Sequence, residues 1–225
     1  LVADKKGNTV YALDEGSGEV VWRYVAGAAV DSPPSIYRGM ALFGSADGRV
    51  YCVRLSDGAL VWRFLAARAD VRTVAQNRVE SLWPVHGSVL ILNDVAYCSA
   101  GRSTWLDGGI DLYALDPVSG EIMSKTHFKS RHPEYCEGKD KAQPEHAARI
   151  DQNVTDYKTF EESDLSDAFS MAAGAVSDVL VSDGSDVFLH HVCFDSKLNR
   201  RNQLRRHLFS TSSLLDGAEN HRSHW

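Results

Sequence analysis

Short apolar runs alternate with short polar turns along much of the chain, and this pattern predicts an all-β fold. Residues 10–22 read VYALDEGSGEVVW, and residues 50–62 read VYCVRLSDGALVW. In both segments a run rich in β-branched and aromatic residues leads into a turn that ends in Gly, and a second such run follows. Gly18 and Gly58 can supply the positive φ that tight hairpin turns require. Each segment therefore predicts a pair of antiparallel strands.

The residues before the second hairpin complete a unit of four strands. Residues 33–37 and 40–45 predict two strands joined by a turn at 38–39, and a turn at 46–48 leads into the hairpin. The hairpin itself recurs after 40 residues. Four short strands joined by hairpins within about forty residues are typical of a β-propeller blade.

A third copy of the hairpin covers residues 111–122, after predicted inner strands at 89–92 and 95–101. It follows the second copy by 62 residues rather than 40, because residues 66–80 and 103–109 are inserted. Insertions in repeat proteins map to loops on one face, which is often the binding face. We therefore expect the functional residues where the repeat is interrupted.

A fourth unit has a weaker pattern, with predicted strands at residues 178–182 and 187–192. A long polar segment precedes it, in which residues 165–173 predict a short helix. The chain opens with the last strands of a blade, so we expect their partner strands elsewhere in a longer protein. We expect residues 1–225 to form one partial β-propeller domain of about four blades or blade fragments. The expected fragments span residues 1–26, 27–66, 80–128 and 174–225, with a long insertion at 129–173.

Residues 12–22 resemble the tryptophan-docking repeat of quinoprotein (PQQ-type) β-propellers, whose pattern is Ala-x-Asp-x-x-Thr-Gly-x-x-x-Trp. The second and third copies resemble it less completely. The matching residues are Ala12, Asp14, Gly18, Trp22, Gly58, Trp62, Ala114, Asp116 and Gly120. The departures are Ser17 in the first copy, Cys52, Arg54 and Asp57 in the second, and Ser124 in the third, where the Trp is lost.

The resemblance implies a structural role for this repeat. In such propellers the Trp packs against the neighbouring blade, the Gly closes the turn and the Asp accepts backbone hydrogen bonds. It also implies a bacterial protein of about seven or eight blades, in the periplasm or elsewhere outside the cytoplasm. Relatives of this fold include the quinoprotein alcohol dehydrogenases and the outer-membrane assembly lipoprotein.

The resemblance leaves two functions open. Quinoprotein dehydrogenases hold PQQ with Ca²⁺, use an Asp base and often stack the cofactor on a disulfide of adjacent cysteines, whereas no two of the four cysteines here are adjacent. Acidic and amide residues such as Asp107, Asp151, Asn153 and Asp156 lack the spacing of a Ca²⁺ loop. We therefore expect a non-enzymatic propeller without a cofactor, which is a binding or scaffold module for a protein or small ligand. The alternative is a PQQ-dependent dehydrogenase with PQQ and Ca²⁺, or a relative with a degenerate site.

Composition excludes other classes of function. The net charge is -6, so the chain lacks the basic balance of a general nucleic-acid-binding protein. No apolar run reaches the roughly 20 residues needed to span a bilayer. Hydrophobic residues make up 44% of the chain, enough for a substantial core. Cys52 and Cys98 follow Tyr residues in apolar runs and are expected to be buried thiols, with a disulfide as the alternative in a secreted protein.

The loop at residues 100–109 is the strongest candidate for a ligand or partner contact. It carries Arg102, Trp105 and Asp107 among flexible glycines, between the second and third strands of its blade. Loops at this position of a propeller line one mouth of the central channel, where ligands commonly bind. The alternative is a loop whose Trp only caps a neighbouring blade.

No metal site is predicted. The histidine groups either match no standard zinc spacing, place neighbouring imidazoles on opposite faces of a strand, or lie where no helix is predicted. These groups are His132 with Cys136 and His146, His190 with His191, and His221 with His224. A basic cluster near the end of the chain predicts a solvated loop between blades, with an anion-binding patch as the alternative. Its members are Lys197, Arg200, Arg201, Arg205 and Arg206.

Overall fold

The described part of the chain is all-β, as the sequence predicts. The computed structural model describes residues 1–75, 77–104, 106–129, 177, 179–189 and 192–201. Within these ranges it contains sixteen strands and no helix, and every strand pair is antiparallel. No helix in this part is long and apolar enough to cross a membrane.

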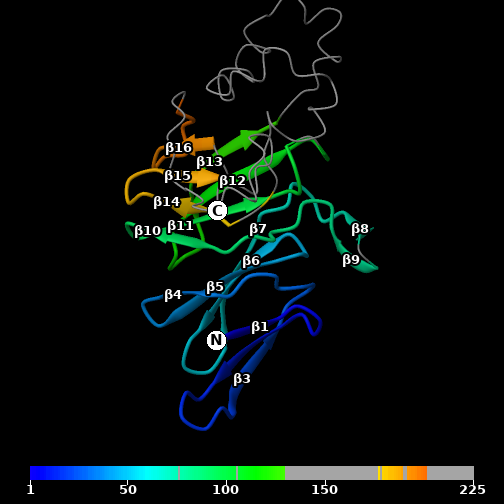
Figure 1. Ribbon diagram of the computed structural model, residues 1–225, viewed down its shortest axis with the longest axis vertical. Helices are drawn as coiled ribbons and strands as arrows, with labels where there is room; N and C mark the ends of the chain where they lie inside the picture. Colours follow the sequence, from blue (N-terminus) through cyan, green and yellow to red (C-terminus); the bar gives the residue numbers. More distant parts are fainter. Residues whose placement is uncertain (76, 105, 130–176, 178, 190–191, 202–225) are drawn as a thin grey trace, which may run out of the picture.

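Four sheets follow one another along the chain and lie side by side in Figure 1, from blue at the N-terminus to orange. The first contains β1 (Val2–Asp4), β2 (Thr9–Leu13) and β3 (Val20–Val25). The second contains β4 (Ser35–Tyr37), β5 (Met40–Ser45), β6 (Arg49–Arg54) and β7 (Leu60–Leu65). The third contains β10 (Leu90–Leu92), β11 (Val95–Ala100), β12 (Ile110–Leu115) and β13 (Ile122–Phe128). The fourth contains β14 (Val181–Ser182), β15 (Val187–Leu189) and β16 (Val192–Phe194). These sheets are the blades of a partial β-propeller.

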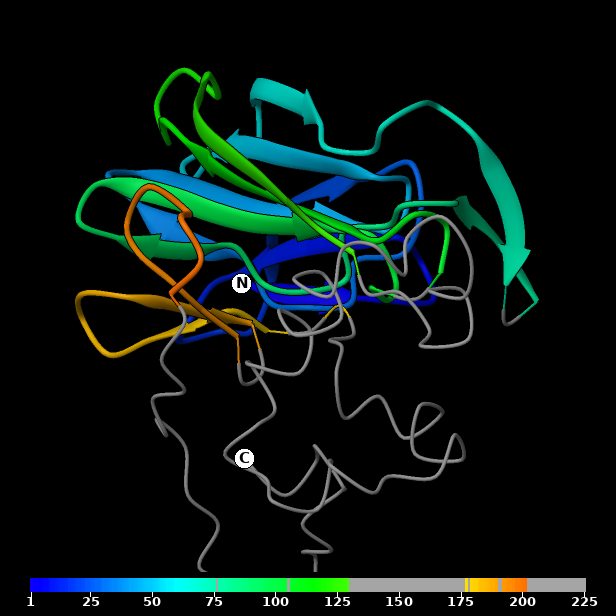
Figure 2. The same ribbon diagram turned by 90° about the horizontal axis from the view of Figure 1, so that it is seen from above.

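The structure corrects two details of the predicted strands. A single strand was expected over residues 187–192, whereas the structure has the hairpin β15–β16, in which Leu189 pairs with Val192. The sequence did not predict this turn because no Gly, Pro or Asn marks it. The insertion at residues 66–80 includes a two-stranded hairpin, β8 (Arg72–Ala75) and β9 (Arg78–Ser81), which projects to one side of the sheets (Figures 1 and 2). The helix expected at residues 165–173 lies outside the described residues.

The hydrophobic core lies between successive sheets. Strand β12 is buried along its whole length and β6 along most of it, because each of these strands is covered on both faces by neighbouring sheets. This explains their nearly continuous apolar sequences, whereas the outer strands β3, β7 and β13 alternate between exposed and more buried residues. Three buried clusters join the first sheet to the second, the second to the third and the third to the fourth.

Each of the first two sheets is joined to the next through a tryptophan on its outer strand. The Trp22 indole N–H donates to the Leu55 carbonyl at 2.8 Å, and the Trp62 indole N–H donates to the Pro117 carbonyl at 3.1 Å. At the third junction Ser124 stands in place of Trp, and its hydroxyl donates to the Lys197 carbonyl at 2.5 Å. The same bond between sheets is therefore made three times with two kinds of donor.

The turns of the repeat are held by side-chain acceptors. Asp14 Oδ1 accepts hydrogen bonds from the backbone N–H groups of Gly16 and Ser17, and Asp116 Oδ1 accepts from those of Val118 and Ser119. These hydrogen bonds, with the backbone N–H of Ser17 as the largest contribution for Asp14, lower the pKa of both carboxyl groups. In the second copy, where the Asp is replaced by Arg54, the guanidinium pairs with Asp57 at 2.7 Å.

Candidate functional site

The segments that interrupt the repeat meet at one edge of the sheets. Successive strands are antiparallel, so the β5–β6 turn and the β11–β12 loop lie at the same edge as the linkers from β3 to β4 and from β7 to β10. The β8–β9 hairpin is part of the second linker and therefore rises from this edge. We call this edge, with its loops and linkers, the insertion face.

Backbone hydrogen bonds tie the loops of the insertion face together. Ala46 in the β5–β6 turn donates to the Ala29 carbonyl at 2.7 Å and accepts from the Ser81 N–H at 2.7 Å. Gly101 donates to the Pro84 carbonyl at 3.0 Å, and Ser177 donates to the Arg102 carbonyl at 2.8 Å. Further bonds of this kind run from Ala26 to Asn8, from Ala66 and Ala67 to Gly48 and from Val85 to Ser45. The face is therefore a connected backbone surface and not a set of independent loops.

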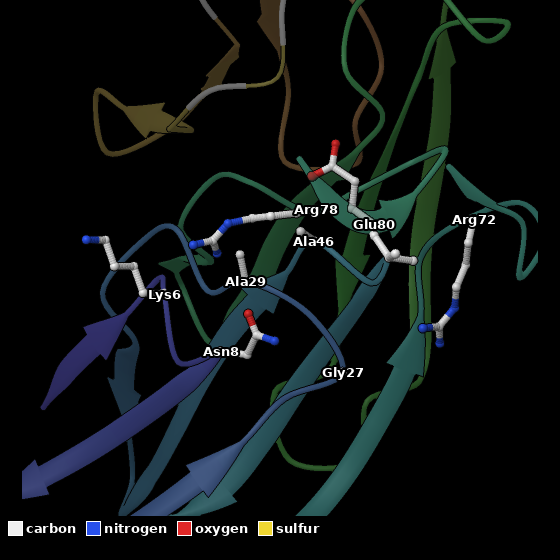
Figure 3. Close-up of a pocket in the computed structure, with 9 residues that line it drawn as sticks. Lys6, Asn8, Gly27, Ala29, Ala46, Arg72, Arg78 and Glu80 are labelled. Atoms are coloured by element: carbon white, nitrogen blue, oxygen red, sulfur yellow. The ribbon is translucent and has the colours of Figure 1, made fainter. Parts of the chain in front are cut away.

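A cavity of about 420 Å³ opens on this face between the first two sheets and the β8–β9 hairpin (Figure 3). Its floor is made of Gly27, Ala29 and Ala46, whose side chains are small or absent. Its walls carry Lys6 and Asn8 from the β1–β2 turn, and Arg72, Arg78, Val79 and Glu80 from the hairpin.

The polar side chains of the cavity lie around its rim. Figure 3 shows Lys6 and Arg78 toward one end of the cavity and Arg72 toward the other. Arg78 Nη1 donates to the Lys5 carbonyl at 2.5 Å, which holds the hairpin against the β1–β2 turn. Glu80 is occupied by Arg102, whose Nη2 lies 2.6 Å from Glu80 Oε1.

A buried polar pair lies next to the cavity floor. The Tyr51 hydroxyl donates to Asp47 Oδ2 at 2.5 Å, and Asp47 Oδ1 accepts from the Arg49 N–H at 3.0 Å. The Gly27 N–H in turn donates to the Tyr51 hydroxyl oxygen at 3.3 Å. Burial, with a contribution from Asp47, raises the pKa of Tyr51 well above its ordinary value, so the phenol stays protonated and acts as a structural donor.

Of the three predicted contact residues, Arg102 touches a residue of the cavity lining, Glu80. Arg102 is mostly buried, and its Nη2 bonds to Glu80 and to the Ser81 carbonyl at 3.0 Å, so it reaches the cavity only through Glu80. Asp107 is exposed with a φ of 52°, and its carbonyl accepts from the Trp83 indole N–H at 2.8 Å. Trp105 lies outside the described residues. The ligand contact expected of these three residues stays a prediction.

Two further charge clusters lie on the same face. In the first, the buried carboxylate of Asp111 is bonded by Arg68 Nε at 2.6 Å and faces His127 Nδ1 at 3.2 Å and Lys125 Nζ at 3.7 Å. Arg68 also lies over the ring of Trp83 at 5.8 Å. With three cationic or basic groups around one carboxylate, this cluster fastens β12 and β13 to the linker that follows β7.

The second cluster joins the β1–β2 turn to the linkers that follow β3 and β7. Asp31 Oδ2 lies 2.5 Å from His86 Nδ1, and Asp31 Oδ1 lies 2.8 Å from Lys5 Nζ. Burial alone would raise the pKa of Asp31, but hydrogen bonds from His86 and Lys5 outweigh it and lower the pKa to about 2. Asp31 is therefore ionised at neutral pH and holds the β1–β2 turn and the two linkers together through its ion pairs.

Sequence reasoning missed the cavity residues because they carry no local motif. Arg72 and Arg78 lie in an insertion that was identified only by the lengthened spacing, and Lys6 lies in a short turn. The basic residues that form a cluster in the sequence, near its end, do not line the cavity. Arg201 pairs with Asp186 at 3.0 Å, and Arg200 lies over the Phe128 ring at 4.5 Å, while Arg205 and Arg206 lie outside the described residues.

The described residues include three of the four cysteines and part of the acidic side chains of the chain. Within these ranges no group of three or more His, Cys, Asp or Glu side chains is placed to hold a metal ion. Cys52 and Cys98 are buried and free, whereas Cys193 is buried with its Sγ 3.7 Å from Asp186 Oδ2. Burial raises the pKa of Cys52 and of Cys98 to about 12, so both remain protonated and neither is a nucleophile at neutral pH.

The remaining metal and cofactor candidates of the sequence lie outside the described residues. They are Asp151, Asn153, Asp156, His132, Cys136, His146, His190, His191, His221 and His224.

Two solved structures are similar to this chain at low sequence identity. The quinohemoprotein alcohol dehydrogenase of Comamonas testosteroni is 14% identical, with 86% of this chain and 31% of that chain covered at a TM-score of 0.53. BamB of Moraxella catarrhalis is 16% identical, with 88% of this chain and 44% of that chain covered at a TM-score of 0.46. The chain thus spans less than half the length of either protein. No curated protein sequence matches it.

A protein-family model identifies the repeat more directly. The model described as outer membrane protein assembly factor BamB, built on PQQ-type repeats, matches residues 1–154. This match covers well over half of the 225 residues and includes the first three sheets with both tryptophan junctions. The chain therefore belongs to the PQQ-repeat β-propeller family of the outer membrane protein assembly factor BamB.

Proposed function

We propose that the protein is a non-enzymatic β-propeller that acts as a binding or scaffold module, and that its ligand or protein partner binds on the insertion face. The observation that supports this is the cavity of about 420 Å³ between the first two sheets and the β8–β9 hairpin. Its volume lies within the range of small-ligand sites, which is roughly 300–1,000 Å³. The repeat itself supplies only the rigid frame.

The chemistry of the cavity supports binding more than catalysis. Its lining offers Lys, Arg and Asn side chains as hydrogen-bond donors, and its one carboxylate, Glu80, is occupied by Arg102 at 2.6 Å. A general base or nucleophile with a partner that activates it is the usual sign of a catalytic site. The cavity lining contains no Ser, Cys or His that could serve in such a pair.

The proposed location is outside the cytoplasm. The support for this is the family model, which covers residues 1–154 and is named for an outer-membrane assembly factor. A scaffold role in the cell envelope would use the insertion face to hold a partner while the sheets keep its loops in place.

The competing function, a PQQ-dependent dehydrogenase, is separated from this proposal by activity. The protein would be incubated with PQQ and Ca²⁺, and electron-acceptor dye reduction would be followed with alcohols and sugars as substrates. We expect no reduction above that of PQQ and Ca²⁺ alone. Turnover that requires the protein would overturn the proposal, and turnover is the decisive readout because a carboxylate-bearing cofactor could bind without reacting.

The binding role has its own test in an envelope extract of the source organism. Immobilised wild type would be compared with Arg78→Glu in the cavity and with Arg23→Glu on the exposed outer strand β3, which changes the net charge equally. We expect at least one component to be retained by wild type and Arg23→Glu and lost from Arg78→Glu. Equal retention by all three proteins would contradict a partner site at the cavity.

A further inference from the structure

We infer that the cavity on the insertion face is an oxyanion site, which takes a small organic molecule bearing phosphate or carboxylate groups. This inference rests on the proposed function, because it names the ligand class of the same site. The net charge of the chain is -6, yet the cavity is lined by three cationic side chains, Lys6, Arg72 and Arg78, against the single carboxylate of Glu80. The local charge is therefore opposite in sign to that of the whole chain.

The one carboxylate does not neutralise the cavity. Glu80 Oε1 lies 2.6 Å from Arg102 Nη2, and the two side chains are only 12% and 23% exposed. The guanidinium of Arg102 therefore balances the negative charge of Glu80. The other carboxylate near the floor is that of Asp47, which accepts hydrogen bonds from the Tyr51 hydroxyl and the Arg49 N–H, and the three cations of the rim outnumber it.

The three cations lack full partners of their own. Among the described residues Lys6 forms no ion pair, and Arg78 is bonded to a neutral group, the Lys5 carbonyl, at 2.5 Å. Arg72 Nε lies 3.7 Å from Asp70, a carboxylate that it shares with Arg49 at 3.3 Å. By contrast, the neighbouring Lys5 is paired with Asp31 at 2.8 Å. The unbalanced charge is thus concentrated on the side chains that face the cavity.

The geometry suits an oxyanion. The bond from Arg78 Nη1 to the Lys5 carbonyl fixes the guanidinium beside the β1–β2 turn, and its remaining N–H groups can donate to a ligand. A guanidinium held in this way loses little conformational entropy on binding and recognises phosphate or carboxylate with two parallel hydrogen bonds. Lys6 adds a second charge at the same end, whereas Arg72 lies toward the other end (Figure 3).

The floor allows close approach of such a ligand. Gly27, Ala29 and Ala46 present little side chain, and Asn8 adds an amide to the wall. The cavity of about 420 Å³ is larger than a single phosphate ion requires. We therefore assign it to a molecule with an anionic group at the Lys6–Arg78 end and a polar body or second anionic group that extends toward Arg72.

Titration calorimetry at low ionic strength tests the inference. The probes are glucose 6-phosphate, citrate and inorganic phosphate, with glucose as the neutral control. We expect saturable binding of one or more of the anions and none of glucose, with weaker binding as NaCl is raised, because salt screens these charges. Preference for glucose 6-phosphate over citrate identifies phosphate as the recognised group, and the reverse preference identifies carboxylate.

Matched variants locate the binding. Arg78→Gln is expected to weaken binding about tenfold or more, since a charge-assisted hydrogen bond is lost. Lys6→Gln and Arg72→Gln should each weaken it by a smaller factor. Arg23→Gln, on the outer strand β3, should leave it unchanged. Circular dichroism and the thermal midpoint would verify that each variant is folded.

Two outcomes would overturn the inference: no saturable binding of any anion, or binding that Arg23→Gln weakens as much as Arg78→Gln does. These two outcomes are independent of the PQQ turnover assay and of the partner-retention assay. If the wild type binds no anion but still retains its partner, this inference alone is rejected. Protein-dependent dye reduction with PQQ would instead reject the proposed function.

Discussion

The indole ring of Trp22 lies directly on Gly58 of the following sheet. A β-carbon at Gly58 would stand 2.7 Å from Cε3 and 2.8 Å from Cδ2 of that ring, and the same relationship recurs between Trp62 and Gly120. Gly58 therefore meets two requirements at once. Its φ of 72° lies in the left-handed region that favours glycine, and its missing side chain makes room for the ring.

These two requirements can be separated by a matched pair of variants. Gly18 has the same φ of 72°, and no atom lies within 4 Å of the position that a β-carbon would take there. Gly18→Ala therefore measures backbone strain alone, about 1–2 kcal/mol. Gly58→Ala should cost this amount plus about 1–3 kcal/mol for overpacking against Trp22. Urea denaturation of both variants measures the difference, and equal losses of stability would show that the ring moves aside without cost.

At the junction between the third and fourth sheets the small residue is on the outer strand and the large one is on the turn opposite. Ser124 is small, and the turn opposite carries Leu198, which is 1% exposed and has a φ of 62°. Leu198→Gly would relieve the backbone by about 1–2 kcal/mol. It would also remove a buried leucine side chain, at a cost of about 2–5 kcal/mol.

We therefore expect Leu198→Gly to lower the thermal midpoint, although glycine is the residue of the other two junctions. Ser124→Ala serves as the comparison, because it removes only the hydrogen bond to the Lys197 carbonyl and should cost about 1 kcal/mol or less. A higher midpoint for Leu198→Gly would mean that the Leu198 side chain contributes little packing.

The repeated part of the fold could be predicted closely from the sequence. Strands β5, β6 and β11 begin within a residue of their predicted positions, because each is bounded by a turn with Gly, Asn or Asp at positive φ. The β8–β9 hairpin could not be predicted. Its paired residues Val74 and Val79 are 72% and 57% exposed, so no buried face imposes an alternating pattern on its sequence.

The candidate site could be predicted only as a region. The interruptions of the repeat indicated which face to examine, and the predicted residue Arg102 proved to hold Glu80 at the edge of the cavity. The residues that line the cavity are spread along the sequence from Lys6 to Glu80. Hydrogen bonds between backbone groups far apart in the chain bring them together. Such bonds have no signature in side-chain sequence, so no local window reveals the concentration of positive charge.

The stability of the folded protein at acid pH should depend on the ion pairs of Asp31 with Lys5 and His86. Its folded pKa of about 2 lies below the ordinary value of 3.8, so the ionised form favours folding. This contribution is fully present above about pH 4 and is lost as the pH falls toward 2. After allowance for solvent screening it amounts to about 1–2 kcal/mol.

Asp31→Asn is therefore expected to be less stable than wild type at pH 7, with a difference that narrows between pH 4 and pH 2. Denaturation curves across this range measure it. Asp94→Asn provides the control, because its ion pair with Arg38 is 66% exposed on both sides and should contribute little. A constant difference between Asp31→Asn and wild type down to pH 2 would contradict a role for the Asp31 charge.

Arg102 should act on the cavity by holding Glu80. Arg102→Ala would remove the 2.6 Å ion pair and the bond to the Ser81 carbonyl, leaving the mostly buried carboxylate of Glu80 without its partner. We expect a loss of about 1–3 kcal/mol in stability. We also expect weaker binding of glucose 6-phosphate or citrate, since Glu80 would then oppose the three cations of the rim.

The double variant Arg102→Ala with Glu80→Gln distinguishes this positioning role from direct contact. If Arg102 acts only through Glu80, neutralising Glu80 should restore anion binding to near the wild-type level, because the unpaired negative charge is gone. If Arg102 touches the ligand itself, the double variant should bind the anion as weakly as Arg102→Ala does.

Asp107→Asn tests the other described residue of the predicted loop contact, because its carboxylate is exposed and asparagine tolerates the φ of 52°. Its stability should therefore be unchanged, and any loss of binding would report direct contact.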